Sequence, residues 1–167
     1  MPITPLHFGV LAPVNHLAPG RVSNVSFVLV NLMVDFHSIL WWLTGYNGGP
    51  THGVEHSFLG ILPLILYVSL LRMWSLKWWL GAALGGLSHV VLDALVHSDM
   101  SPFYPLTGNP LYADLMGPLS GALLVLCAWL TLQYVSSIRA KVAWLLEEPL
   151  HGTAGPSAAD TATAHAE

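Results

Sequence analysis

One stretch of the sequence constrains the fold more than any other: Leu115–Ser137 is predominantly apolar and contains no Lys, Arg, Asp or Glu. A helix of this length is roughly 34 Å long, enough to cross the roughly 30 Å hydrocarbon core of a bilayer. Charged residues make up only 8% of the 167-residue chain, against roughly 25% in an ordinary soluble domain. The sequence therefore predicts a membrane protein and excludes a soluble globular enzyme.

Three further apolar segments have a length suited to crossing, although each contains an Asp or a His: Val22–Leu43, His56–Leu71 and Trp78–His97. A fourth, Pro5–Ala18, is too short to cross and is interrupted by Pro13. The predicted fold is all-α, a polytopic transmembrane helix bundle with four full crossings and a short N-terminal partial helix. We expect this membrane-embedded domain to cover residues 1–146, with a flexible tail rich in Ala, Thr, Gly and Pro over residues 147–167.

The five basic residues predict the orientation of this bundle. With four crossings all of them fall on one side of the membrane; they are Arg21, Arg72, Lys77, Arg139 and Lys141. By the positive-inside rule that side is the cytoplasm, so the C-terminus is expected to be cytoplasmic. So few basic residues argue against a nucleic-acid partner and leave membrane lipids as the expected partners. The sequence makes no prediction of the oligomeric state.

Ionisable side chains are costly at membrane depth, so those inside the predicted crossings are candidates for a functional site. Counted along each helix from the nearest basic residue, Asp35, His56 and Asp93 lie roughly 21 to 24 Å from the cytoplasmic side, and His89 roughly 18 Å. His7 reaches a similar level if the first segment is helical. The predicted site therefore lies near the outer membrane interface.

Spacing along the chain supports convergence of these groups. His89, Asp93 and His97 follow one another at intervals of four residues and share one helix face, and His52 and His56 have the same interval. They are expected to converge on one point.

The segment around Asp35 is less regular. Asp35 and His37 are two residues apart, so a regular helix would direct only one of them at the site. Asn31, four residues before Asp35, is a candidate to orient that carboxylate. Asp99, in the loop after the third crossing, is expected to be a turn or cap residue.

Imidazole and carboxylate together are a ligand set that suits Zn, Mn or Fe, and the only cysteine, Cys127, lies in an apolar run. A cation would also supply partners that lipid cannot offer. We therefore predict a site for one or two divalent metal ions, with zinc as the first choice. The open alternatives are a hydrogen-bonded network that joins helices without metal, haem ligation by a pair of histidines, and a path for ions or protons.

Residues His52–His56 also read H-x-x-E-H, a spacing found in one class of zinc peptidases. Because so short a motif recurs by chance and no long soluble cleft accompanies it, we favour another role for Glu55, that of a general base beside a metal ion. The alternative for Glu55 is a solvated loop carboxylate. Asp93 is the second candidate proton acceptor.

Four motifs, in order, resemble those of a known family. They are Met1–Phe8, Asp35 at the end of the next apolar segment, His52 with His56 and Ser57, and Leu87–His89 with Asp93. From Met1 to about Tyr112 the chain is similar to the inner-membrane-associated metal-dependent hydrolases, also described as LexA-binding. The resemblance implies a polytopic protein of the bacterial inner membrane with hydrolase activity. It also implies a metal site made by His7, Asp35, His56, His89 and Asp93, with His52 joining them.

Two departures from the family pattern affect the expected ligands. The family has paired aspartates in the pattern P-D-x-D-H, whereas Met33–His37 contains one, so His37 is expected to replace the missing carboxylate. The family often has Arg after its first loop His and Thr before its second, where this chain has Gly53 and Glu55.

The sequence thus predicts a membrane-embedded metal-dependent hydrolase that acts near the outer interface on a lipid-like ester or phosphoester. The candidate metal ligands are His7, Asp35, His37, His52, His56, His89 and Asp93, and the candidate catalytic residues are Glu55 and Asp93. The competing predictions are a non-enzymatic membrane protein that binds metal for structure, sensing or transport, and a haem-binding membrane protein.

Overall fold

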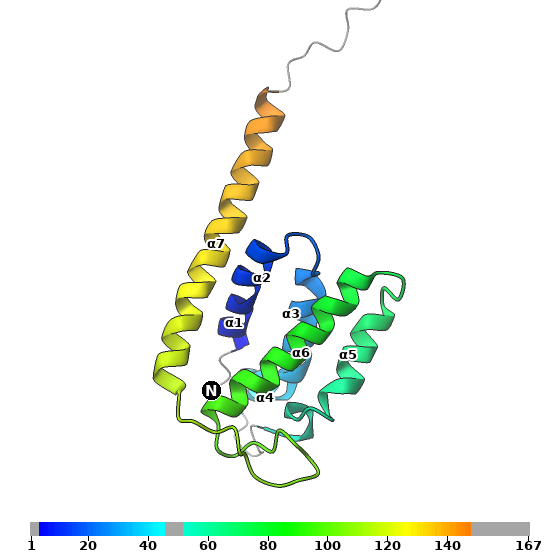
Figure 1. The fold of residues 1–167 in the computed structure, drawn as a ribbon, viewed down its shortest axis with the longest axis vertical. Coiled ribbons are helices and arrows are strands. Elements are labelled where there is room, and N and C mark those ends of the chain that lie inside the picture. The colour runs from blue at the N-terminus through cyan, green and yellow to red at the C-terminus, as the bar shows by residue number, and fades with distance from the viewer. Residues whose placement is uncertain (1–3, 46–51, 148–167) are drawn as a thin grey trace, which may run out of the picture. The chain divides into compact units, whose positions relative to one another are not determined.

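A computed structural model describes residues 4–45 and 52–147, and the regular elements within these ranges are all helical (Figure 1). In chain order they are α1 (Thr4–His7), η1 (Phe8–Val10), α2 (Leu11–Leu17), α3 (Asn24–Val34), α4 (Phe36–Thr44), η2 (Val54–His56), α5 (Ile61–Leu70), α6 (Leu76–Val96) and α7 (Met116–Glu147), where η1 and η2 are 3₁₀ turns. The prediction of an all-α protein is confirmed.

Two of the described helices are long and apolar enough to cross a membrane. They are α6 and the Met116–Ala143 part of α7. Helices α3 and α5 are apolar but shorter, roughly 15 to 17 Å each, about half the thickness of a hydrocarbon core. The predicted bundle of four full crossings is therefore not confirmed.

Two of the predicted crossings are shortened where candidate site residues lie. The Val22–Leu43 segment is divided at Asp35, whose backbone (φ −85°, ψ 5°) separates α3 from α4. The His56–Leu71 segment becomes α-helical only at Ile61, because η2 is a 3₁₀ turn and Ser57 after it is extended (φ −113°, ψ 158°). In each segment a buried polar side chain lies outside the regular α-helix: Asp35 directly after α3, and His56 before α5.

The chain divides into two units, residues 1–131 and 132–167, and α7 contributes to both. In the second unit the described residues are 132–147, which belong to α7. Helix α7 continues past Ser137, the predicted end of the last crossing, to Glu147. Residues 148–167, nearly all of the predicted flexible tail, lie outside the described residues.

Helices α3 and α6 run parallel at very short distance, because glycines of α6 face α3. The Ser23 N–H donates to the Lys77 carbonyl (2.9 Å) where both helices begin. Further along, a Cβ atom at Gly85 would lie 2.6 Å from the Phe27 carbonyl oxygen. Close backbone approach of this kind is what a G-x-x-x-G spacing permits.

Helix α5 runs antiparallel to α6 and completes the core. The indole N–H of Trp78, near the start of α6, donates to the Val68 carbonyl near the end of α5 (2.6 Å). At the other end of the pair, Gly86 faces Ile61 and Ile65. The cluster around Val30, Val34, Ile61, Ile65, Val68, Trp78, Ala82 and Val90 joins α3, α5 and α6.

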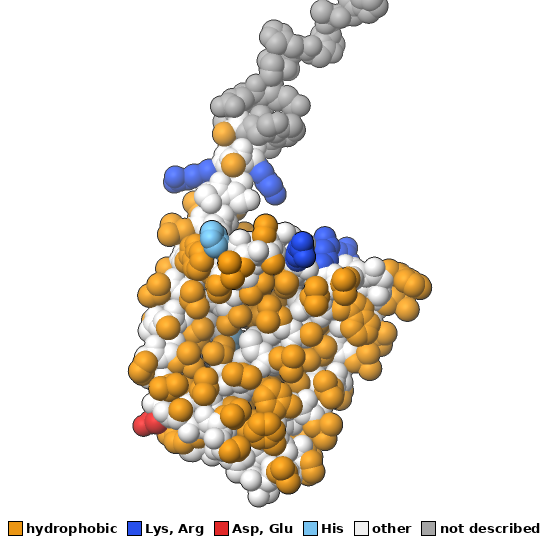
Figure 2. Space-filling model, viewed as in Figure 1, with side chains coloured by type: hydrophobic (Ala, Val, Ile, Leu, Met, Phe, Trp, Pro, Cys, Tyr) orange, Lys and Arg blue, Asp and Glu red, His pale blue; other side chains and the backbone are white. Residues whose placement is uncertain are grey.

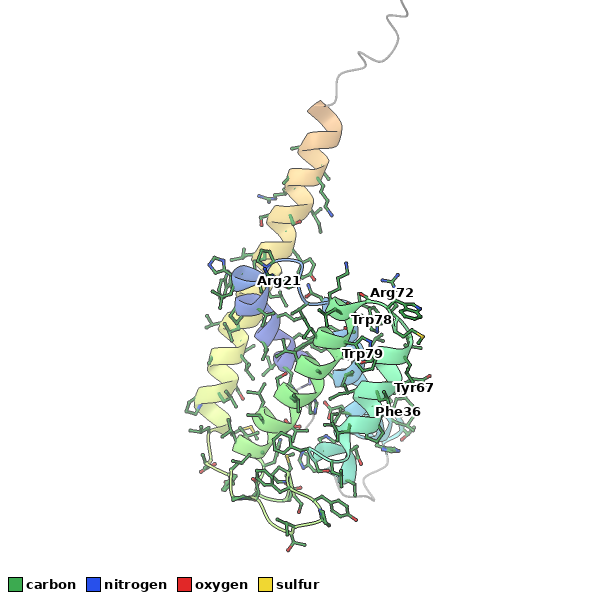
Figure 3. The ribbon with its side chains drawn as sticks, turned by 45° about the vertical axis from the view of Figure 1, so that its right-hand side comes forward. Arg21, Phe36, Tyr67, Arg72, Trp78 and Trp79 are labelled. Atoms are coloured by element: carbon green, nitrogen blue, oxygen red, sulfur yellow. The ribbon has the colours of Figure 1, made fainter. Side chains whose placement is uncertain are left out.

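One end of residues 1–131 carries basic and aromatic side chains. Arg21, before α3, and Arg72, after α5, lie at one end, with Trp78 and Trp79 beside them (Figure 3). Hydrophobic side chains cover most of the face seen in Figure 2. This surface is not confined to one element, and strongly exposed examples include Leu17, Leu62, Trp74, Leu106 and Val125.

The glycines of α6 yield a stability prediction with an internal control. Gly85→Ala places a Cβ against the Phe27 carbonyl, and we expect overpacking to cost about 1–3 kcal/mol. Gly121→Ala adds a Cβ in α7 with nothing within 4 Å, so its effect should be neutral or stabilising by up to about 1 kcal/mol. Thermal unfolding of both variants in detergent measures the difference. Equal melting temperatures would contradict the close α3–α6 contact.

Candidate metal centre

Four side chains from three segments of the chain converge inside the bundle. They are Asp35 after α3, His56 of η2, and His89 and Asp93 of α6. Each offers a ligand atom that lies within 4.8 Å of the other three, and all four residues are buried. We call this group the inner centre.

Local structure explains how each ligand is positioned. His89 and Asp93 lie one helical turn apart on the same face of α6, and Asp35 occupies the break between α3 and α4. The tight turn after η2 holds His56, because the Ser57 hydroxyl donates to the Val54 carbonyl (2.6 Å) and accepts from the Gly60 N–H (2.9 Å).

The atom separations suit a shared ion. His56 Nε2 lies 3.1 Å from Asp35 Oδ1, and His89 Nε2 lies 3.0 Å from Asp93 Oδ2 and 3.5 Å from Asp35 Oδ1. His56 Nε2 is also 3.9 Å from Asp93 Oδ2. Ligands at about 2.0–2.2 Å from one ion lie roughly 3–4 Å from each other, so the four atoms surround a volume of the right size.

Asn31 fixes the tautomer of His89. The Asn31 amide NH₂ donates to the Phe27 carbonyl (2.9 Å), which turns its oxygen toward His89 Nδ1 (2.9 Å). An amide oxygen only accepts, so His89 Nδ1 must carry a proton. In the neutral ring the lone pair is then on Nε2, the atom that faces the two carboxylates.

That Nε2 atom has no hydrogen-bond partner among the described residues, although it is fully buried. Its 3.0 Å contact with Asp93 Oδ2 lacks the alignment of a hydrogen bond. A lone pair that faces carboxylate oxygens is repulsive unless Nε2 is protonated or a cation lies between them. The donor set and this buried, unpartnered atom therefore fit a divalent metal.

His7 supports the inner centre from outside. Its Nε2 lies 3.2 Å from Asp93 Oδ1, the oxygen that does not face His89 Nε2, and its Nδ1 lies 3.1 Å from His89 Nδ1. Helix α1 contacts α3 and α6, and nearby Gly9 packs so closely on α7 that a Cβ there would be 2.8 Å from the Leu123 carbonyl oxygen. His7 is thus placed to orient a ligand carboxylate, a role that commonly tunes metal sites.

Two predicted site residues lie at the edge of this group. The side chain of His37, at the start of α4, is 67% exposed, and its Nδ1 lies 4.0 Å from Glu55 Oε1. Glu55 is partly buried, and its Oε1 is 3.6 Å from His56 Nδ1, on the opposite side of the ring from Asp35. Glu55 therefore contacts His56 on the side away from the inner centre, and His37 lies farther out, next to Glu55.

His52 and His97 form a separate group with Asp99. Helix α6 ends at Val96 and His97 is extended (φ −117°, ψ 112°), so the shared face predicted for His89, Asp93 and His97 stops before His97. His52 Nδ1 lies 3.0 Å from Asp99 Oδ2. Partial burial opposes ionisation of Asp99, but the hydrogen bond and charge of His52 outweigh it and lower the pKa of Asp99.

Two of these polar residues make contacts that the sequence did not predict. Asn31 was expected to orient Asp35, but its amide oxygen faces His89. Asp99 was expected to be a turn or cap residue; it lies in the turn at residues 98–99, and it also contacts His52. The contact between Asn31 and His89 has a signal in the sequence. Residues recur at four-residue intervals on both helices, as Gly81, Gly85 and His89 on α6 and as Ser23 (the N-cap), Phe27 and Asn31 on α3. These positions lie opposite each other because the two helices are parallel.

No protein-family model, curated protein or solved structure matches this chain. The resemblance to the inner-membrane metal-dependent hydrolases consequently stays a prediction from motifs.

The contact between Asn31 and His89 predicts an effect on metal affinity without removal of a ligand. Asn31→Leu takes away the acceptor for His89 Nδ1–H, and loss of such a support typically weakens binding about 10–100-fold. Asn31→Asp keeps an acceptor oxygen but loses the amide donor to the Phe27 carbonyl, so its affinity should lie between those of Asn31→Leu and the wild type. Competition with a chromogenic zinc chelator measures both. Unchanged affinity in Asn31→Leu would contradict the assigned role.

Proposed function

We propose that the chain is a membrane-embedded metal-dependent hydrolase whose inner centre binds a divalent ion, with zinc as the first choice. The observation that carries the proposal is the buried Nε2 atom of His89, which faces carboxylate oxygens of Asp35 and Asp93 and has no hydrogen bond among the described residues. Two imidazoles and two carboxylates are the donors that such an ion prefers.

A divalent ion bound here would lower the pKa of a bound water and polarise a substrate bond. The chain's own residues would prepare that chemistry. His7 holds the second oxygen of Asp93, Asn31 holds the ring of His89, and Glu55 stands at His56 with its side chain 29% exposed. From this position Glu55 would orient the His56 ring rather than accept a proton from a bound water, because it contacts the ring nitrogen that faces away from the inner centre.

Exposed apolar surface supports the membrane setting. In the apolar window of α7 only 6% of residues are buried, whereas the core helix of a soluble protein would be mostly covered. We propose that α6 and α7 cross the membrane, and that α3 with α4, and α5 with its flanking turns, complete four crossings. The alternating directions of α3, α5 and α6 support this arrangement, because they bring Arg21, Arg72 and Lys77 to one end.

The position of the inner centre along α6 suggests the kind of substrate. Asp93 follows Lys77 by sixteen residues on one continuous helix, roughly 24 Å. The loop after α6 exposes Phe103, Tyr104 and Leu106 near this end. A bacterial inner-membrane protein with its basic end and C-terminus in the cytoplasm would hold the centre near the outer interface. A lipid-like ester or phosphoester would reach it there.

One observation favours a second candidate function, a non-enzymatic metal site. Four buried protein ligands can fill a tetrahedral shell, as in structural zinc sites, whereas catalytic zinc sites usually keep a position for water. Both candidate functions predict bound metal, so an assay of hydrolysis is needed to distinguish them.

The decisive variants remove single donors. We expect purified wild type to contain at least one equivalent of metal and to cleave a short-chain lipid ester or phosphodiester in mixed micelles. Asp93→Asn and His56→Ala should lose the metal and at least about 100-fold of activity, since the ion would supply the activated water. His16→Ala, an exposed histidine away from the centre, is the control. Elemental analysis and product assays measure both properties. Metal without any hydrolysis would leave the non-enzymatic function, and wild type without metal would overturn both.

The orientation is tested with single cysteines in a Cys127→Ser background. Ser75→Cys lies at the start of α6, beside the basic end, and Thr107→Cys lies in the exposed loop after α6. In intact cells a membrane-impermeant maleimide should label Thr107→Cys, and should label Ser75→Cys only after permeabilisation. The opposite pattern would show that the proposed topology is inverted.

A further inference from the structure

His52, His97 and Asp99 form a compact group of metal-ligating side chains that the inner centre does not use. Their ligand atoms lie within 4.8 Å of one another. The three residues come from the loop before η2, the residue after α6 and the loop that follows. Two imidazoles and one carboxylate on separate segments thus meet at one point.

Direct contacts support a shared ligand position. His52 Nδ1 is 3.0 Å from Asp99 Oδ2, and the rings of His52 and His97 have centroids 4.2 Å apart. Two histidines and a carboxylate are a common set for Zn²⁺ and other first-row divalent ions. The inner centre offers four protein ligands, whereas this group offers three. An ion held by three protein ligands keeps coordination positions open to water or to a substrate oxygen.

Accessibility distinguishes this group from the inner centre. The Asp99 side chain is 58% exposed and that of His52 is 10% exposed, whereas the inner ligands are all buried. The two groups are nevertheless neighbours, because the rings of His52 and His56 meet edge to face with centroids 5.1 Å apart. An ion held by the outer group would therefore lie between the surface and the inner centre.

We propose that His52, His97 and Asp99 form a second divalent-metal site, open to solvent and more readily exchanged than the inner one. The inference rests on the proposed function in one respect, that the inner centre also binds metal. It assigns His52, His97 and Asp99 to a second ion, where the sequence predicts one or two. It also makes the outer position the one that a substrate meets first.

Metal stoichiometry tests the proposal. Protein saturated with Zn²⁺ and freed of excess metal by gel filtration should contain two equivalents. Asp99→Asn and His97→Ala should each contain one, and His37→Ala, an exposed histidine outside both groups, should keep two. A brief treatment with EDTA should remove one equivalent from the wild type and none from Asp99→Asn. Elution volume and circular dichroism check that each variant is folded.

Each result bears on a different claim. One equivalent in the wild type and one in both outer variants would overturn the second site and leave the inner centre intact. Loss of both ions from folded Asp99→Asn would show a single shared site and would also overturn the proposal. Absence of zinc from the wild type would overturn the outer site together with the proposed function. Two equivalents in the wild type, one in each outer variant and two in His37→Ala would support it.

Discussion

The structure depends on the neutralisation of two carboxylates buried among apolar helices. Asp35 and Asp93 each direct an oxygen at His89 Nε2, and His56 closes the group. A buried charge is strongly destabilising unless it is paired and hydrogen-bonded. Positive charge is therefore required at this point, either as an imidazolium ring or as a bound metal ion. The Asn31 amide fixes which ring nitrogen of His89 faces the carboxylates.

The helix packing serves this requirement. Gly81 and Gly85 let α6 approach α3 until His89 reaches Asn31, and the breaks at Asp35 and Ser57 release side chains that a continuous helix would direct elsewhere. The cost is helix length, because α3 and α5 are too short to cross a bilayer alone. The apolar bundle thus accommodates a polar centre where its helices are interrupted.

Much of this could be predicted from sequence, because the signals are local. Helical class follows from long apolar runs, and the i, i+4 spacing of His89 and Asp93 directly predicts a shared face.

The break at Asp35 was not predictable, since nothing in the apolar pattern marks it, and it separates Asp35 from His37. The end of α6 at Val96, which moves His97 to the group of His52 and Asp99, likewise depends on tertiary contacts. The chain has two G-x-x-x-G spacings, Gly81–Gly85 and Gly117–Gly121, and the sequence alone does not distinguish which is buried, because burial is set by the partner helix. Gly85 faces α3, and Gly121 has nothing within 4 Å.

X-ray absorption spectroscopy at the edge of the copurifying metal is the most direct measurement of the central claim. The inner centre predicts a nitrogen and oxygen shell at about 2.0–2.2 Å with imidazole scattering beyond it and no sulfur. That imidazole signal should fall in His89→Ala. A sulfur shell, a hydrated ion without imidazole scattering, or a spectrum unchanged in His89→Ala would contradict the metal centre described for Asp35, His56, His89 and Asp93.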